Sequence, residues 1–137
     1  MNHKIGSAVI GCGGMGSFHC HRMDESPETD FIGAYDILPE KLAMNMPAGK
    51  RAYSSLEELL DDPHVELVTV ATPNDVHKDI VIKALGAGKH VVCEKPVTMT
   101  VADLDDMIAA SERAGRIFTV HQNRRWDPDY LAMKNIF

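Results

Sequence analysis

The sequence predicts an α/β protein in which helices cover both faces of a doubly wound parallel sheet. Short apolar and β-branched runs alternate with helical patterns along the chain, and the connections between them are short. The first of these runs leads directly into a Gly-x-Gly-x-x-Gly pattern. An acidic residue follows the second run at the spacing that belongs with that pattern. Together these three observations favour a nucleotide-binding sheet with right-handed crossovers.

The glycine pattern lies where the first strand meets the first helix. Residues 5–10 are mostly apolar and predict a strand, and residues 15–23 contain no Pro and a single Gly, as a helix requires. The glycines allow a tight turn and let a pyrophosphate approach backbone amides at the helix N-terminus. Such spacing also arises by chance in flexible loops, so the strand–turn–helix context carries the prediction. The expected cofactor-binding residues here are Gly11, Gly13, Gly14, Met15 and Gly16.

Asp36 follows the second predicted strand, residues 31–35, about 20 positions after the glycines. A carboxylate there can accept hydrogen bonds from the adenosine ribose. The alternative is that Asp36 caps the helix that starts near Pro39, and both roles can coexist. Its charge would repel a 2′-phosphate, and the next residue is Ile37 rather than Arg. The sequence therefore favours NAD as cofactor over NADP.

The remaining elements continue the alternation. A capping-box pattern of Ser55 and Glu58 predicts a short helix, and a second helix opens at Thr100 and closes at Gly115. In order, the expected elements are a helix over 56–61, strand 66–71, helix 76–85, strand 90–93, the helix between Thr100 and Gly115, and strand 117–120.

Small, polar and cationic residues follow several of the predicted strands. In a doubly wound sheet, ligands bind at the carboxyl ends of the strands, so these residues are expected at one edge. They are Gly11 to Gly16, Asp36, Thr72-Pro73-Asn74 with His77, Glu94-Lys95-Pro96, and His121-Gln122-Asn123-Arg124.

The bulk composition is that of an ordinary globular protein of about one domain, with 137 residues, 45% hydrophobic and 25% charged. The 14 Lys and Arg against 20 Asp and Glu give a net charge of -6, which disfavours binding to nucleic acid or an anionic membrane surface. No apolar run approaches membrane-spanning length, and the first strand begins too early for a signal peptide. A cytoplasmic location is expected.

The three cysteines Cys12, Cys20 and Cys93 are scattered and predict small packing residues in a reduced compartment. The run His19-Cys20-His21 suggests a metal, but residues two apart on a helix point to different faces. No metal site is predicted.

The run Val92-Cys93-Glu94-Lys95-Pro96 resembles the signature after the fifth strand of the glucose-fructose oxidoreductase, inositol dehydrogenase and MocA family. Thr72-Pro73-Asn74 with His77 is similar to the family's loop after the fourth strand, and 122–125 to its loop after the sixth. The resemblance covers nearly the whole chain. It implies a Rossmann fold and an oxidoreductase.

The resemblance also implies roles for single residues. Thr72, Pro73 and Asn74 would line the cofactor, Glu94 and Lys95 would lie beside the nicotinamide, and Lys95 would be catalytic, with a cis peptide bond before Pro96. An ammonium at this point can hold and polarise a secondary hydroxyl and, if desolvation and the nicotinamide charge favour the neutral amine, help to receive its proton. The remaining implied cofactor-binding residues are His77, Asn123 and Arg124. Glu94 and Lys95 could instead form a solvated pair, and His77 could be a capping or packing residue.

Relatives in this family carry a second, α+β domain that supplies most substrate contacts and the subunit interface. The resemblance divides this chain into a dinucleotide-binding domain over 1–125 and the start of that second domain over 126–137, so the chain is expected to be a fragment. Homo-oligomers are expected only for the full-length protein. The implied substrate is a small sugar-, inositol- or polyol-like alcohol. The alternatives are a dinucleotide-sensing regulatory module without catalysis and, more remotely, a methyl-donor-binding enzyme.

Overall fold

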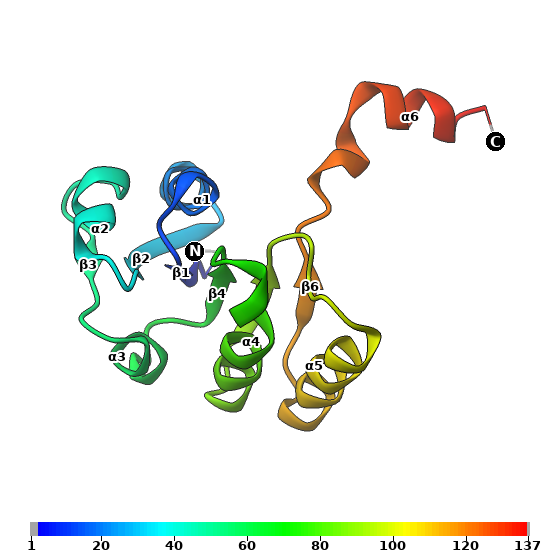
Figure 1. Ribbon diagram of the computed structural model, residues 1–137. Helices are drawn as coiled ribbons and strands as arrows, with labels where there is room; N and C mark the ends of the chain where they lie inside the picture. Colours follow the sequence, from blue (N-terminus) through cyan, green and yellow to red (C-terminus); the bar gives the residue numbers. More distant parts are fainter. Residues whose placement is uncertain (1–2, 137) are drawn as a thin grey trace.

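A computed structural model describes residues 3–136 and confirms the predicted fold class. Six parallel strands form one sheet in the order β3-β2-β1-β4-β5-β6 (Figure 1). The strands are β1 (Ile5–Ile10), β2 (Thr29–Tyr35), β3 (Arg51–Ala52), β4 (Leu67–Val70), β5 (His90–Cys93) and β6 (Phe118–Val120). The order reverses between β1 and β4, which is the switch point at which doubly wound sheets bind ligands.

Helices cover both faces of this sheet. They are α1 (Gly14–Glu25), α2 (Pro39–Asn45), α3 (Leu56–Asp61), α4 (His77–Gly86), α5 (Val101–Ala114) and α6 (Pro128–Lys134), with short 3₁₀ turns η1 (Asn74–Val76) and η2 (Asn123–Trp126). Figure 1 shows α1 and α2 on one face, α3 to α5 on the other, and α6 projecting away beyond β6. Within the segment 126–137, α6 covers Pro128–Lys134, and Phe137 lies outside the described residues.

The core consists of two apolar clusters, one on each face of the sheet. Along β1, Val9 faces the cluster beneath α1 and α2, whereas Ala8 and Ile10 face the cluster beneath α3, α4 and α5. This alternation follows from the period of two along a strand. β1 pairs with β2 on one side and with β4 on the other, so its end is held rigidly at the centre of the sheet.

Both predicted helix starts have a side-chain cap, although the Glu58 carboxylate accepts from the Ser54 amide rather than from that of Ser55. The Ser55 hydroxyl accepts a hydrogen bond from the Glu58 amide at 3.0 Å, and the Thr100 hydroxyl accepts one from the Asp103 amide at 3.1 Å. Gly115 ends α5 in the left-handed conformation, with φ 60°. The three cysteines are free and buried, as expected of packing residues.

Strand β3 was not predicted from the sequence. It has two residues, both exposed, and so produces no apolar run. Backbone geometry specifies it instead, because β3 lies so close to Gly33 of β2 that a Cβ there would overlap the Arg51 carbonyl oxygen. Among the described residues, no helix is long and apolar enough to cross a membrane.

Candidate dinucleotide-binding site

The turn between β1 and α1 is shaped by two glycines that tolerate no side chain. Gly11 has φ +89°, and a Cβ added to it would lie 2.8 Å from the Ala71 carbonyl oxygen. A Cβ added to Gly16 would overlap the carbonyl oxygen of Gly11 itself. The first residue therefore needs glycine for its backbone conformation and the second for the close packing of helix against strand.

The outer side of the same turn is open. A Cβ added to Gly13 or Gly14 would meet no heavy atom within 4 Å. Gly13 is the N-cap of α1, and in the described part of the chain no side chain caps this helix. The first amides of α1 and the positive end of its dipole thus face open space, as an anion-binding helix terminus requires.

Asp36 braces this turn from the end of β2. One carboxylate oxygen accepts a hydrogen bond from the Cys12 amide at 2.6 Å, and the other accepts one from the Leu38 amide at 2.9 Å, just before α2. The side chain is nearly buried, yet it lines the adjoining cavity. Asp36 does not cap α2, because the N-cap is Leu38 and no side chain forms a cap hydrogen bond there within residues 3–136. Each carboxylate oxygen keeps a lone pair for a further donor such as a ribose hydroxyl.

A cavity of about 630 Å³ lies at the switch point between the ends of β1, β2 and β4. Five predicted residues line it, namely Gly11, Gly13, Asp36, Thr72 and Pro73. The Thr72 hydroxyl oxygen is buried and has no hydrogen-bond partner within residues 3–136. An open helix terminus, a carboxylate with spare lone pairs and a hydroxyl without a partner fit a dinucleotide. Lys41 also lines this cavity and was missed, because a lysine on a helix gives no distinctive sequence signal.

His77 belongs to the scaffold of this site. It is fully buried, its Nε2 donates to the Thr72 carbonyl at 2.9 Å, and its Nδ1 lies 3.2 Å from the carbonyl oxygens of Pro96 and Val97. Its ring thus ties the loop after β4 to the loop after β5. These contacts agree with the packing role that the sequence left open, and direct cofactor contact by His77 stays a prediction.

Glu94, at the end of β5, is buried between two histidines. One carboxylate oxygen accepts hydrogen bonds from His19 Nε2 at 2.7 Å and from His121 Nδ1 at 2.8 Å, and the other accepts one from the Lys95 amide at 3.2 Å. Burial by itself would raise the pKa of Glu94, but the bonds from His19 and His121 outweigh it and lower that pKa. Burial also lowers the pKa of His19, so its neutral form is favoured.

The Lys95 side chain is exposed at the strand end, and the Lys95-Pro96 bond is cis, as the resemblance implied. Asn74, in η1, is exposed as well. The solvated Glu94–Lys95 pair considered as an alternative is not formed, because the Glu94 carboxylate is buried against the imidazoles instead.

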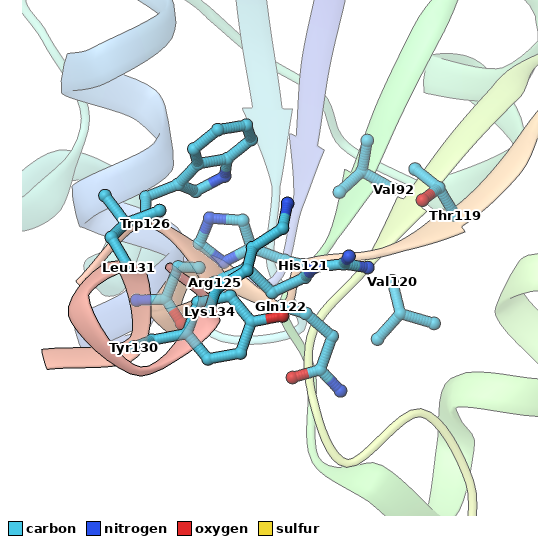
Figure 2. A pocket seen from close by; sticks show the side chains of 11 residues that line it. Val92, Thr119, Val120, His121, Gln122, Arg125, Trp126, Tyr130, Leu131 and Lys134 are labelled. Carbon is cyan, nitrogen blue, oxygen red and sulfur yellow. The ribbon is translucent and has the colours of Figure 1, made fainter. Parts of the chain in front are cut away.

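The end of β6 borders a second cavity, also of about 630 Å³ (Figure 2). His121 and Asn123 line it together with Trp126 and Tyr130 from η2 and α6. Arg124 is directed elsewhere, with its side chain 87% exposed and paired with Asp127 at 2.9 Å. The strand-end residues thus gather along one edge of the sheet as predicted, but around two cavities. Arg124 is not among the residues that line either cavity.

The metal prediction needs one addition. Within His19-Cys20-His21 the histidines diverge, since His21 bonds the Ser17 carbonyl on its own helix at 2.9 Å. His19 instead meets Glu94 and His121, and one ligand atom from each lies within 4.8 Å of the others. This cluster was missed because its members come from α1, β5 and β6. The available signal was that Glu94 and His121 each directly follow a strand.

The glycine turn at the switch point, the acidic residue after β2 and the strand order define the class of protein, a dinucleotide-binding domain of the Rossmann type. The oxidoreductase family with an NAD-binding Rossmann fold, the glucose-fructose oxidoreductase, inositol dehydrogenase and MocA family, matches residues 5–122, and the chain belongs to it.

Three similar proteins illustrate the match. The uncharacterized oxidoreductase YdgJ of Escherichia coli is 41% identical over 99% of this chain. The scyllo-inositol 2-dehydrogenase (NADP(+)) IolW of Bacillus subtilis is 34% identical over 97% of it. The crystal structure of an NAD-binding protein from Listeria innocua superposes with a TM-score of 0.93 at 46% identity over 98% of this chain. The chain spans 39%, 37% and 40% of these proteins, respectively.

Proposed function

We propose that this chain is the cofactor-binding part of an NAD(P)-dependent oxidoreductase that acts on a secondary alcohol of a sugar-, inositol- or polyol-like molecule. The observation that carries the proposal is the cavity at the switch point, which is lined by Gly13 at the N-terminus of α1, by Asp36 and by Thr72. A relative named scyllo-inositol 2-dehydrogenase (NADP(+)) supports the substrate class.

A bound nicotinamide cofactor would supply the hydride acceptor. The chain's own contribution is to bind and to hold a proton. The pyrophosphate would meet the amides after Gly13, and the ribose would meet Asp36. The exposed Lys95 ammonium would hold and polarise the substrate hydroxyl, and in its neutral amine form Lys95 would receive the hydroxyl proton. Asn74 and Asn123, both exposed at the strand ends, would contribute polar contacts.

The preference for NAD over NADP is part of the proposal. The Asp36 carboxylate disfavours a 2′-phosphate, and Ile37 follows it. Lys41 lines the same cavity and would attract a 2′-phosphate. Because Asp36 is fixed by two backbone amides whereas Lys41 is on a helix surface, we expect the carboxylate to dominate.

A cytoplasmic location and a domain boundary near residue 125 complete the proposal.

The alternative, a dinucleotide-sensing module without catalysis, would bind the cofactor in the same way. Lys95 favours the enzyme, because a sensor has less use for an exposed cation at the strand end where hydride transfer would occur. We expect the 137-residue chain alone to bind cofactor but to turn over polyols poorly, since substrate positioning contributes on the order of 7 to 11 kcal/mol in well-oriented models. Robust turnover by this chain would contradict that expectation.

Calorimetric titration of the wild-type chain and of the variant Gly13→Val with NAD⁺ and NADP⁺ tests the proposal. The wild type should bind NAD⁺ more tightly. The valine at Gly13 meets open space in the protein, so circular dichroism should be unchanged, yet it would occupy the approach of the pyrophosphate. We expect at least tenfold weaker binding, about 1.4 kcal/mol. Wild-type affinity in the folded variant would place the phosphate site elsewhere.

A further inference from the structure

We propose that His19 and His121 are positioning residues that hold the Glu94 carboxylate, and through it the backbone of Lys95, in place for the nicotinamide end of the cofactor. The inference rests on the proposed function. It assigns a role to two histidines that lie outside the glycine loop and outside the Glu94-Lys95-Pro96 signature.

The cluster joins three elements that are distant in sequence. His19 comes from the second turn of α1, Glu94 directly follows β5, and His121 follows β6. The side chains of His19 and Glu94 are 8% and 6% exposed, and that of His121 is 26% exposed. The two imidazole rings also pack edge to face with centroids 4.7 Å apart. Loss of one ring would therefore disturb the other as well as the carboxylate.

The carboxylate passes this constraint to the reactive lysine. Its second oxygen accepts the Lys95 amide at 3.2 Å, and one residue further on the Pro96 carbonyl faces the buried ring of His77. The backbone around Lys95 is thus bonded on both sides, while its side chain is free and exposed. A buried carboxylate deprived of a partner costs substantial free energy, so the segment would shift if an imidazole were lost.

The distances favour hydrogen bonds over a metal ion in this cluster. His19 Nε2 and His121 Nδ1 lie 2.7 and 2.8 Å, respectively, from the same Glu94 carboxylate oxygen. Ligands of one tetrahedral Zn²⁺, with bonds of about 2.0 to 2.2 Å, would be separated by roughly 3.3 Å. Each contact is short enough for an N–H donor to bond a carboxylate directly. Zinc binding is the competing outcome that the experiment must recognise.

The test uses the geometry of the two rings. A Gln amide nitrogen can take the place of His Nε2, and an Asn amide nitrogen can take that of His Nδ1. His19 bonds through Nε2 and His121 through Nδ1. We therefore expect His19→Gln and His121→Asn to retain function, and the exchanged variants His19→Asn and His121→Gln to lose it. His21→Asn is the matched control, because His21 is exposed on the same helix and bonds its own helix.

The readout compares two ligands, NAD⁺ and ADP-ribose, by calorimetry on the 137-residue chain. ADP-ribose lacks the nicotinamide, so it reports on the glycine turn and Asp36 alone. The exchanged variants should bind NAD⁺ about tenfold more weakly, a loss of 1.4 kcal/mol. Their affinity for ADP-ribose should equal that of the wild type. The retaining variants and His21→Asn should match the wild type with both ligands.

Other results would contradict the positioning role in distinct ways. Equal losses for both ligands would make the histidines merely structural, and no loss for either would remove their positioning role. Zinc retained in stoichiometric amount by the wild type and lost in the exchanged variants would replace positioning by metal binding. A wild type that binds neither ligand would overturn the proposed function itself, and this inference with it.

Discussion

The two halves of the candidate site are built from different materials. The glycine-turn half is made of backbone, since Gly11 and Gly16 lie so close to carbonyl oxygens that neither has room for a Cβ, and Asp36 bonds main-chain amides. The strand-end half is made of side chains, with Glu94 held by imidazoles from two other elements. Backbone shape tolerates few residue types, whereas a side-chain network tolerates any substitute that supplies the same donor. Substitutions at Gly11 or Gly16 should therefore cause unfolding, whereas substitutions in the second half should cause loss of function in a folded protein.

The largest expected effect is that of Gly16→Ala. The added Cβ overlaps a backbone carbonyl oxygen that cannot move without shifting β1 or α1, and overpacking of this kind costs about 3 kcal/mol. Urea unfolding should show the loss. Gly14→Ala, whose Cβ meets nothing within 4 Å, is the control and should preserve the free energy of unfolding. Equal stabilities would mean that the turn is not fixed by its backbone.

Lys95→Ala tests the other half. In a full-length protein that contains this chain, turnover should fall about a hundredfold, the scale of a lost acid–base group, while affinity for NAD⁺ stays within about twofold. The separation is expected because Lys95 is exposed and follows β5, whereas the glycine turn follows β1 and β4 lies between these strands. The pH profile of hydride transfer should lose one titrating step. Normal turnover with a lower melting temperature would make Lys95 structural and favour the sensing module.

Asp36→Ala should affect both the stability of the chain and its preference between the two cofactors. It deprives the Cys12 and Leu38 amides of their acceptors, at a cost of about 1 to 3 kcal/mol of stability. It also removes the charge that opposes a 2′-phosphate, so the ratio of NAD⁺ to NADP⁺ affinity should fall toward one. Competitive titration with the two cofactors measures that ratio. An unchanged ratio would show that Lys41 or another group sets the preference.

The smallest effect concerns the pH dependence of stability. The pKa of His19 is lowered in the folded chain by burial, so the unfolded chain binds its proton more readily. Its contribution to stability is therefore fully present above the unfolded pKa of about 6.5 and is lost as pH falls through the folded pKa. Urea unfolding at pH 7.5 and 5.5 should show a smaller decrease for His19→Gln than for the wild type. Identical decreases would rule out His19 as the source.

The sequence predicted the backbone half of the site more completely than the side-chain half. Glycine spacing, an acidic residue after a strand and capping pairs are local signals, and each was found where expected. The contact of His19 with Glu94 joins residues 75 apart, and only the packing of α1 on the sheet creates it. Strand β3 escaped prediction for a related reason, since two exposed residues carry no apolar pattern.

The central place of β1 in the sheet determines when the site can form during folding. β1 pairs with β2, so that Ile5 lies opposite Thr29, but it also pairs with β4, where Ser7 lies opposite Leu67. The pairing of β1 with β4 closes a loop of 60 residues. The entropy lost in closing this loop opposes the pairing until its contacts form, and such non-local parallel pairings slow folding. The Ala71 carbonyl that confines Gly11 follows β4, so the glycine turn gains its final shape only after this late pairing. The candidate site is therefore complete only on chains whose sheet is already assembled.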